Sequence, residues 1–191
     1  MGFLEKVGKG LRDELGKVLR ESSGPATTPK RKAARQETTP LAERGPDPGT
    51  LVSPEEIEAA TGSAPVGEGD RRSGGMDTDI GFFRVCIWQL ADGGQLIVNS
   101  TRIRGPEGEA LLRSRWDDPS WQEGGEKPLA GVGELARTRV TKSPKGGTEL
   151  HVDAKEGRYD ASLVHTSPAG SRDVTPLVAL MTTLLSRLAE S

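Results

Sequence analysis

Apolar residues between positions 51 and 191 follow strand spacing and helix spacing in turn. The strongest strand signal is FFRVCIWQL, residues 82–90, whose nearly continuous apolar character indicates a strand covered on both faces. An Asp-Gly-Gly turn follows, so residues 94–103 are expected to return as a hairpin partner. Alternating residues separated by Gly- and Pro-rich turns predict three more strands, at 134–142, 147–154 and 158–166.

Three segments of the same region have helical signals. Ser53 provides an N-cap, Pro54 suits the first turn and Glu56 completes a capping box, which predicts a helix over residues 54–61. A second helix is expected from Pro106 to about residue 117. The third, over residues 174–189 with Asp173 as its cap, has an apolar stripe that would close the core: Leu177, Leu180, Met181, Leu184, Leu185 and Leu188.

The predicted order of elements is therefore α-β-β-α-β-β-β-α. Antiparallel hairpins with helices packed on one face define an α+β domain, here with a sheet of about five strands. We place this domain at residues 51–191. A domain of roughly 140 residues buries about two thirds of the surface of its unfolded chain, which is enough for independent stability.

The N-terminal segment, residues 1–21, has the spacing of an amphipathic helix. Its apolar residues recur every three or four positions over residues 3–20: Leu4, Val7, Leu11, Leu15 and Val18. An isolated helix of this length is marginal in water, so it is expected to fold against another surface. That surface is its own domain, a partner protein or a membrane, and the sequence leaves these three alternatives open.

Residues 22–50 join the two parts. They contain five prolines and almost no large apolar side chains, so they are expected to form a disordered Pro/Thr-rich linker. Lys30, Arg31, Lys32 and Arg35 form a basic cluster within it. We interpret this cluster as solvated linker charge, with docking to an acidic lipid or nucleic acid as the alternative.

Composition limits the classes of protein to which the chain can belong. Its 191 residues fit one domain, and its 33% hydrophobic content is low for a fully packed chain. A single cysteine excludes an internal disulfide, and no apolar run approaches the roughly 18 residues of a membrane span. Residues 1–50 have a net charge of +3 and residues 51–191 of −5, so charge requires neither a membrane nor a specific nucleic acid as partner.

No catalytic motif is recognisable. The sequence contains no nucleophile elbow, phosphate-binding loop or His-Glu-x-x-His motif. His151 and His165 lie on separate predicted strands without the ligand spacing of a metal site, and Cys86 in mid-strand is expected to be a buried structural thiol. The glycines around Val132 mimic a dinucleotide fingerprint but lead into a strand rather than a helix. We therefore expect no catalytic residue, cofactor or metal.

One group of residues is a candidate ligand surface. Four arginines lie near two tryptophans in the sequence, a combination that can bind an anion or stack on a base: Arg102, Arg104, Arg113, Arg115, Trp116 and Trp121. The alternative is that Trp116 packs beneath its helix while the arginines are solvated.

Residues 47–189 resemble a known family. Four of its motifs are similar to motifs of small actinobacterial cell-surface lipoproteins of unknown function. They are the opening Asp47-Pro48-Gly49-Thr50-Leu51-Val52 with its Ser-initiated acidic helix, the strand Cys86-Ile87-Trp88, the loop PLAGVGELA at 128–136 and the apolar C-terminal helix. The resemblance implies the fold of kinase sensor ectodomains and of the PsbP/Mog1 group. It suggests a binding role and implies no catalytic residues.

Two departures from this family affect the interpretation. The family's first cysteine, which would pair with the cysteine of the Cys-x-Trp strand, is replaced by Gly49, so the resemblance leaves Cys86 without its partner. A signal peptide and a lipid-bearing cysteine are also missing. We therefore expect an intracellular protein, in the cytoplasm or peripheral to the inner face of the membrane.

The sequence favours a non-enzymatic binding or adaptor module whose N-terminal helix docks on a protein partner. The alternatives are a peripheral membrane protein anchored by residues 3–20 and an enzyme of unrecognised type. The ligand, the pathway and the oligomeric state are not determined by the sequence.

Overall fold

The computed structural model describes residues 40, 43–71, 75–118, 125–144 and 146–191. All of these belong to one compact unit, Thr38–Ser191. The predicted helix over residues 3–20 and the predicted linker up to residue 39 lie outside the described residues.

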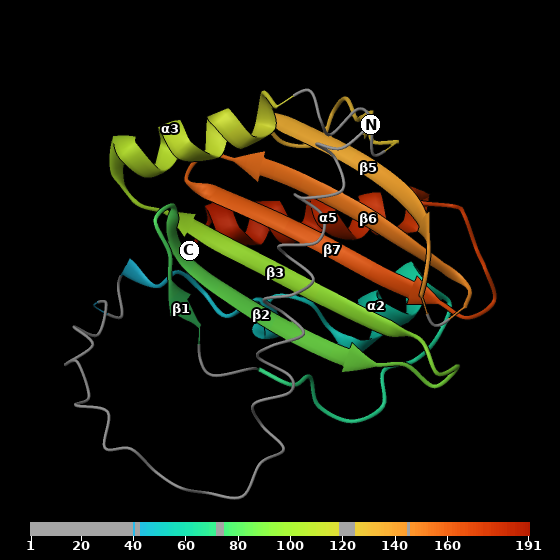
Figure 1. Cartoon of the computed structure of the whole chain (residues 1–191). Coiled ribbons are helices and arrows are strands. Elements are labelled where there is room, and N and C mark those ends of the chain that lie inside the picture. Colours follow the sequence, from blue (N-terminus) through green and yellow to red (C-terminus); the bar gives the residue numbers. More distant parts are fainter. Residues whose placement is uncertain (1–39, 41–42, 72–74, 119–124, 145) are drawn as a thin grey trace, which may run out of the picture. The chain divides into compact units, whose positions relative to one another are not determined.

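The described chain has the predicted α+β class, built on one antiparallel sheet (Figure 1). Its strands are β1 (Met76–Asp77), β2 (Gly81–Gln89), β3 (Gln95–Ile103), β4 (Lys127–Pro128), β5 (Leu135–Lys142), β6 (Thr148–Glu156) and β7 (Tyr159–Ser167). The order across the sheet is β1-β2-β3-β7-β6-β5-β4.

The expectation of about five strands is wrong, because the sheet has seven. The two additional strands, β1 and β4, are each two residues long and lie at the edges of the sheet. A two-residue strand is too short for a period-2 pattern to appear in the sequence, so periodicity could not reveal it.

The described residues contain three α-helices: α2 (Pro54–Thr61), α3 (Gly105–Trp116) and α5 (Thr175–Ala189). The capping box of α2 forms as expected, since Ser53 Oγ accepts from Glu56 N at 3.3 Å and Ser53 N donates to Glu56 Oε2 at 2.8 Å. The cap predicted for α5 is wrong by one residue. Its N-cap is Val174, and Asp173 Oδ1 instead accepts from Thr175 N at 2.9 Å in a local turn before the helix.

Helices α2 and α5 lie on one face of the sheet, where the main core is formed. The register places Cys86, Val98, Leu163 and Val152 side by side across four strands, and all four are fully buried. The apolar stripe of α5 packs on them. Arg187 of α5 also donates to both carboxylate oxygens of Glu56, at 2.6 and 2.8 Å, which joins α5 to α2.

Helix α3 packs on the opposite face, so the expectation that the helices share one face is wrong (Figure 1). Leu112 of α3 contacts Ile80 and Ile103 in a small second apolar cluster. Gly108 permits this approach, because a Cβ there would collide with the carbonyl of Ile80. Among the described helices, α3 alone covers strand residues that face away from the main core, and it does so at one end of the sheet.

The predicted linker ends earlier than expected. Residues 48–50 form a short 3-10 helix, η3 (Pro48–Thr50), which is capped by Asp47 and contacts β2 and β3. Pro48 is fully buried. The few apolar atoms of this segment pack against the sheet. The low hydrophobicity of the segment gives no indication of this packing in the sequence.

Candidate binding surface

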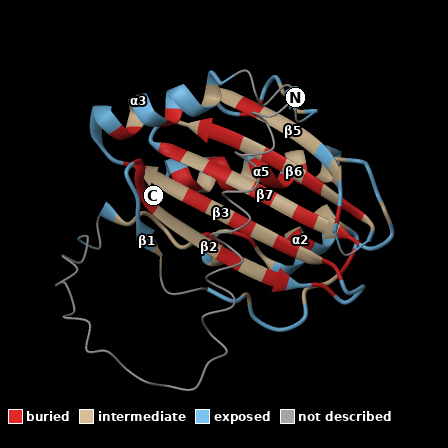
Figure 2. Cartoon of the chain, viewed as in Figure 1, coloured by how far each residue is buried: buried red, intermediate tan, exposed pale blue. Residues whose placement is uncertain are grey.

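The sheet face opposite α2 and α5 is organised in rungs, each formed by residues paired across five strands. Figure 2 shows buried and half-buried residues alternating along these strands. The first rung lies beneath α3 and contains Phe83, Thr101, Asp160, Lys155 and Leu135. The second contains Val85, Asn99, Ser162, Asp153 and Arg137, and the third contains Ile87, Ile97, Val164, His151 and Arg139.

We call the second and third rungs the open face. No described helix covers them, and all ten residues are half-buried. The third rung changes character across the sheet. Ile87, Ile97 and Val164 form an apolar strip, and His151 and Arg139 continue it as a polar end. A surface with an apolar centre and a polar margin has the composition of a binding interface.

The margin of the open face holds a group of four acidic and basic residues, which we call the charged corner: Glu126, Arg137, Arg139 and Asp153. Glu126 lies 3.2 Å from Arg137 Nε and 3.5 Å from Arg139 Nη1, and Arg137 Nε lies 3.6 Å from Asp153. Burial raises the pKa of Glu126, while the two arginines oppose that shift. The described residues thus place two acids and two bases in alternation at one edge.

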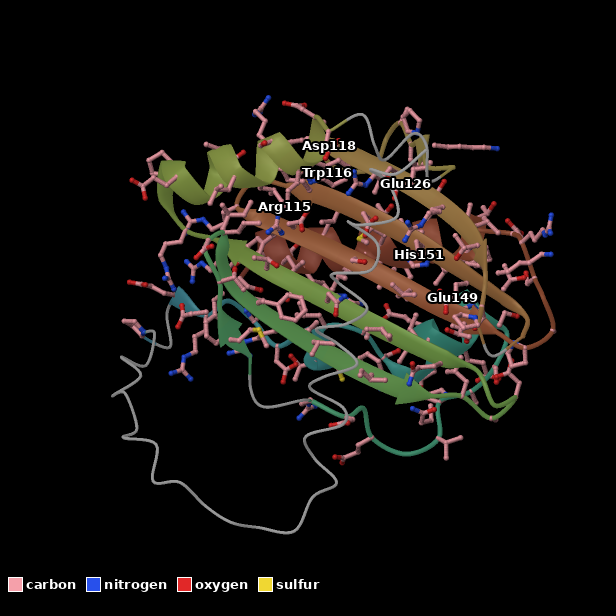
Figure 3. All side chains as sticks on the ribbon, in the orientation of Figure 1. Arg115, Trp116, Asp118, Glu126, Glu149 and His151 are labelled. Atoms are coloured by element: carbon pink, nitrogen blue, oxygen red, sulfur yellow. The ribbon has the colours of Figure 1, made fainter. Side chains whose placement is uncertain are left out.

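His151 lies between the charged corner and the end of the sheet (Figure 3). Burial, and then the positive charge of Arg139, lower its pKa, although Glu149 lies 3.6 Å from Nε2. The imidazole is therefore predominantly neutral at pH 7. His165 is buried on the opposite face, so the two histidines do not share a site.

Trp116 connects α3 to the open face. Its ring stacks under the guanidinium of Arg137, 4.2 Å from the ring centroid, and its Nε1 donates to Asp160 Oδ1 at 3.3 Å. Burial raises the pKa of Asp160 to about 6, although the hydrogen bond from Trp116 opposes the shift. Beside it, Lys155 Nζ pairs with Glu109 of α3 at 3.1 Å and with Glu134 at 2.7 Å.

The structure does not bring the predicted Arg/Trp surface together. Arg102 lies on the opposite face, near Gly45, and Arg104 pairs with Asp77. Arg113 and Arg115 are exposed on α3, while Trp116 packs against Arg137 and Asp160. Trp121 lies outside the described residues, as do Leu4, Val7, Leu11, Leu15 and Val18.

A shallow cavity of about 230 Å³ lies at the end of the sheet remote from α3. It is lined by Gln89, Gly93, Gln95, Ser143, Pro144, Glu149 and Thr166, four of which belong to the rung that follows the open face. Glu149 is the one ionisable group in this lining. The cavity therefore extends the open face with amide and hydroxyl groups rather than with acid–base pairs.

Cys86 is buried beneath η3, and burial raises its pKa to about 11. A thiol with this pKa is a poor nucleophile at neutral pH. Among the described residues, no three His, Cys, Asp or Glu side chains converge in a way that could hold a metal ion.

The charged corner was not predicted from the sequence. Arg137 and Arg139 are two residues apart, as are His151 and Asp153, which is the spacing that places each pair on one side of a strand. The sequence does not provide the register between β5 and β6. Without that register, it could not be predicted that the two pairs lie together on the open face.

Comparison with protein-family models, with curated proteins and with solved structures finds no match to this chain. In the part of the chain that the structure describes, no helix has both the length and the apolar character needed to cross a membrane.

Proposed function

We propose that this protein is a non-enzymatic binding or adaptor module and that its open face holds a partner. The observation that carries the proposal is the third rung, in which Ile87, Ile97 and Val164 form an apolar strip beside His151 and Arg139. Covering such a strip with a partner lowers the free energy of the protein in water, and the polar groups at its end, Arg139 and His151, select the orientation of that partner.

The ionisable groups near this face also favour binding over catalysis. Asp160 is engaged by Trp116, and Glu126 is enclosed by Arg137 and Arg139. The neighbouring cavity offers Glu149 without a second titratable group in its lining. General acid–base chemistry requires a positioned pair that reaches a bound substrate, and the described residues support no such assignment.

The proposal is tested by capture with the full chain as bait, using an extract of the organism that makes it. Ile97→Lys places a charge in the apolar strip, and Val140→Lys is its matched control because Val140 lies on the same sheet outside the open face.

A species retained by the wild type and by Val140→Lys but lost from Ile97→Lys supports the proposal. Equal retention by all three chains, or no specific retention by any of them, contradicts it. The alternative of peripheral membrane binding rests on residues 3–20 and is tested by sedimentation with anionic vesicles at low salt.

A further inference from the structure

The cavity at the end of the sheet remote from α3 is built from four strands and two turns. Its floor is a row of residues paired in register across β2, β3, β7 and β6: Gln89, Gln95, Thr166 and Glu149. Its sides are the turn between β2 and β3, at Gly93, and the turn between β5 and β6, at Ser143 and Pro144. Figure 3 shows Glu149 at this end of the sheet.

The floor of the cavity offers oxygen atoms and a single ionisable group. Gln89, Gln95 and Thr166 each carry a side-chain oxygen that accepts hydrogen bonds, and Glu149 carries a carboxylate, which only accepts. The lining contains no lysine or arginine. A ligand that brings both hydrogen-bond donors and positive charge therefore complements this cavity best.

Glu149 is a carboxylate that the described chain does not pair with a permanent positive charge. Its side chain is 27% exposed, and its ion-pair partner among the described residues is His151, whose Nε2 lies 3.6 Å away. His151 is predominantly neutral at pH 7, because burial and then Arg139 lower its pKa. Arg139 itself pairs with Glu126, at 3.5 Å. A partly buried carboxylate in this position gains electrostatic stabilisation from a cation that a ligand supplies.

The donor set suits an ammonium group better than a metal ion or a guanidinium. Ca²⁺ takes six to eight oxygen ligands, and over the described ranges no three His, Cys, Asp or Glu side chains converge to hold a metal. A guanidinium presents a flat fork that matches the two oxygens of one carboxylate. An ammonium has three donors, which can reach Glu149 and the neutral oxygens of the floor together.

The cavity is continuous with the apolar strip. Ile97 and Gln95 are two residues apart on β3, as are Val164 and Thr166 on β7, so each pair shares one side of its strand. Two residues of a strand cover about 6.8 Å. A lysine side chain has four methylene groups that can lie on the strip while its ammonium reaches the cavity.

We propose that the cavity binds the ammonium group of a lysine side chain of the partner, with Glu149 as the counter-ion. Gln95 and Thr166 accept further hydrogen bonds from the ammonium, and the methylene stem lies on Ile97 and Val164. This inference deepens the proposed function and rests on it for the partner. The apolar strip supplies area to be covered, and the lysine fixes the position of the partner along the strands.

Titration of the full chain with Nα-acetyl-lysine methylamide tests the site without a partner. Binding is followed by the amide chemical shifts of the ¹⁵N-labelled protein at constant ionic strength, and the Nε-acetylated form of the probe is the ligand control. Glu149→Gln removes the carboxylate charge at nearly constant shape. Glu58→Gln, at an exposed position of α2, is the matched protein control.

We expect shift changes centred on Gln95, Glu149 and Thr166. The dissociation constant of the probe should rise at least fivefold in Glu149→Gln and stay within twofold of the wild type in Glu58→Gln. Four results would overturn the proposal: no shift changes at these residues at the highest soluble probe concentration, a loss smaller than fivefold in Glu149→Gln, an equal loss in Glu58→Gln, or equally tight binding of the acetylated probe.

The capture experiment separates the failure of this inference from the failure of the proposed function. Probe binding that depends on Glu149, without capture of any partner, would support the ammonium site and contradict the proposed function. Capture that is lost in Ile97→Lys but fully retained by Glu149→Gln would support the proposed function and overturn the lysine contact.

Discussion

A Cβ atom placed on Gly49 would lie 2.8 Å from the Sγ of Cys86. In a disulfide, the Cβ of one cysteine lies about 3 Å from the sulfur of the other. A cysteine at position 49, in η3 above strand β2, would therefore lie within disulfide distance of Cys86.

Gly49→Cys is expected to form a disulfide with Cys86. The bond would close a loop of about 37 residues and stabilise the oxidised protein by about 2–4 kcal/mol, since it restricts the unfolded chain. The measurement is the melting temperature with and without reductant, together with the loss of two hydrogens in intact mass.

Gly49→Ala is the matched control for this variant. It adds the Cβ without a second thiol, so it should lower the melting temperature through the close contact with Cys86 Sγ, and reductant should have no effect. The placement of η3 over Cys86 would be wrong if Gly49→Cys stayed fully reduced under air oxidation while folding normally.

Asp160 should make the protein more stable at mildly acidic pH. Its native pKa of about 6 lies above the ordinary 3.8, so the native state binds the proton more tightly than the unfolded state. This contribution is fully present below about pH 4 and is lost as the pH rises through 6; it amounts to about 3 kcal/mol.

Asp160→Asn should remove that pH dependence and still accept the hydrogen bond from Trp116. Urea unfolding from pH 4 to 7.5 should show Asp160→Asn gaining stability over the wild type as the pH rises. The control variant is Asp117→Asn, at an exposed position after α3. A difference between Asp160→Asn and the wild type that is constant with pH would refute the assignment.

Removing the acidic partners of Lys155 should destabilise the protein more than replacing Lys155 itself. Its side chain is 4% exposed, whereas the side chains of its partners Glu109 and Glu134 are 37% and 50% exposed. The partners can be hydrated without Lys155, but the buried ammonium cannot be hydrated without them.

Glu109→Gln combined with Glu134→Gln should therefore destabilise the chain by about 3 kcal/mol, and Lys155→Met by less than half of that. Chemical unfolding of the two variants gives the comparison. The reverse ranking would show that Lys155 is hydrated and that α3 does not cover it.

Most long elements were predictable because local signals and tertiary packing agree in them. The helix from Pro54 to Thr61 has a complete capping box, and the strand beginning near Phe82 is apolar on both sides. The side on which α3 packs was not predictable. Helix α3 has a weak apolar stripe, and partly buried polar contacts such as Lys155–Glu109 and Trp116–Asp160 help to hold it there.

The proposed binding surface was harder to predict than the fold. Sequence proximity grouped Arg102 with Arg113, but alternation along β3 directs Arg102 to the other face. The charged corner instead assembles Glu126, Arg137 and Asp153 from segments up to 27 residues apart. Contacts of that kind depend on strand register, which a single sequence leaves open.

The most direct test of the open face as the binding surface is amide hydrogen exchange of the full chain, with and without the species that the wild type captures. The account predicts added protection in β3 and β7 around Ile97 and Val164 and in β6 around His151, with little change in α5. Protection confined to α5, α2 or η3, with the open face unchanged, would contradict it.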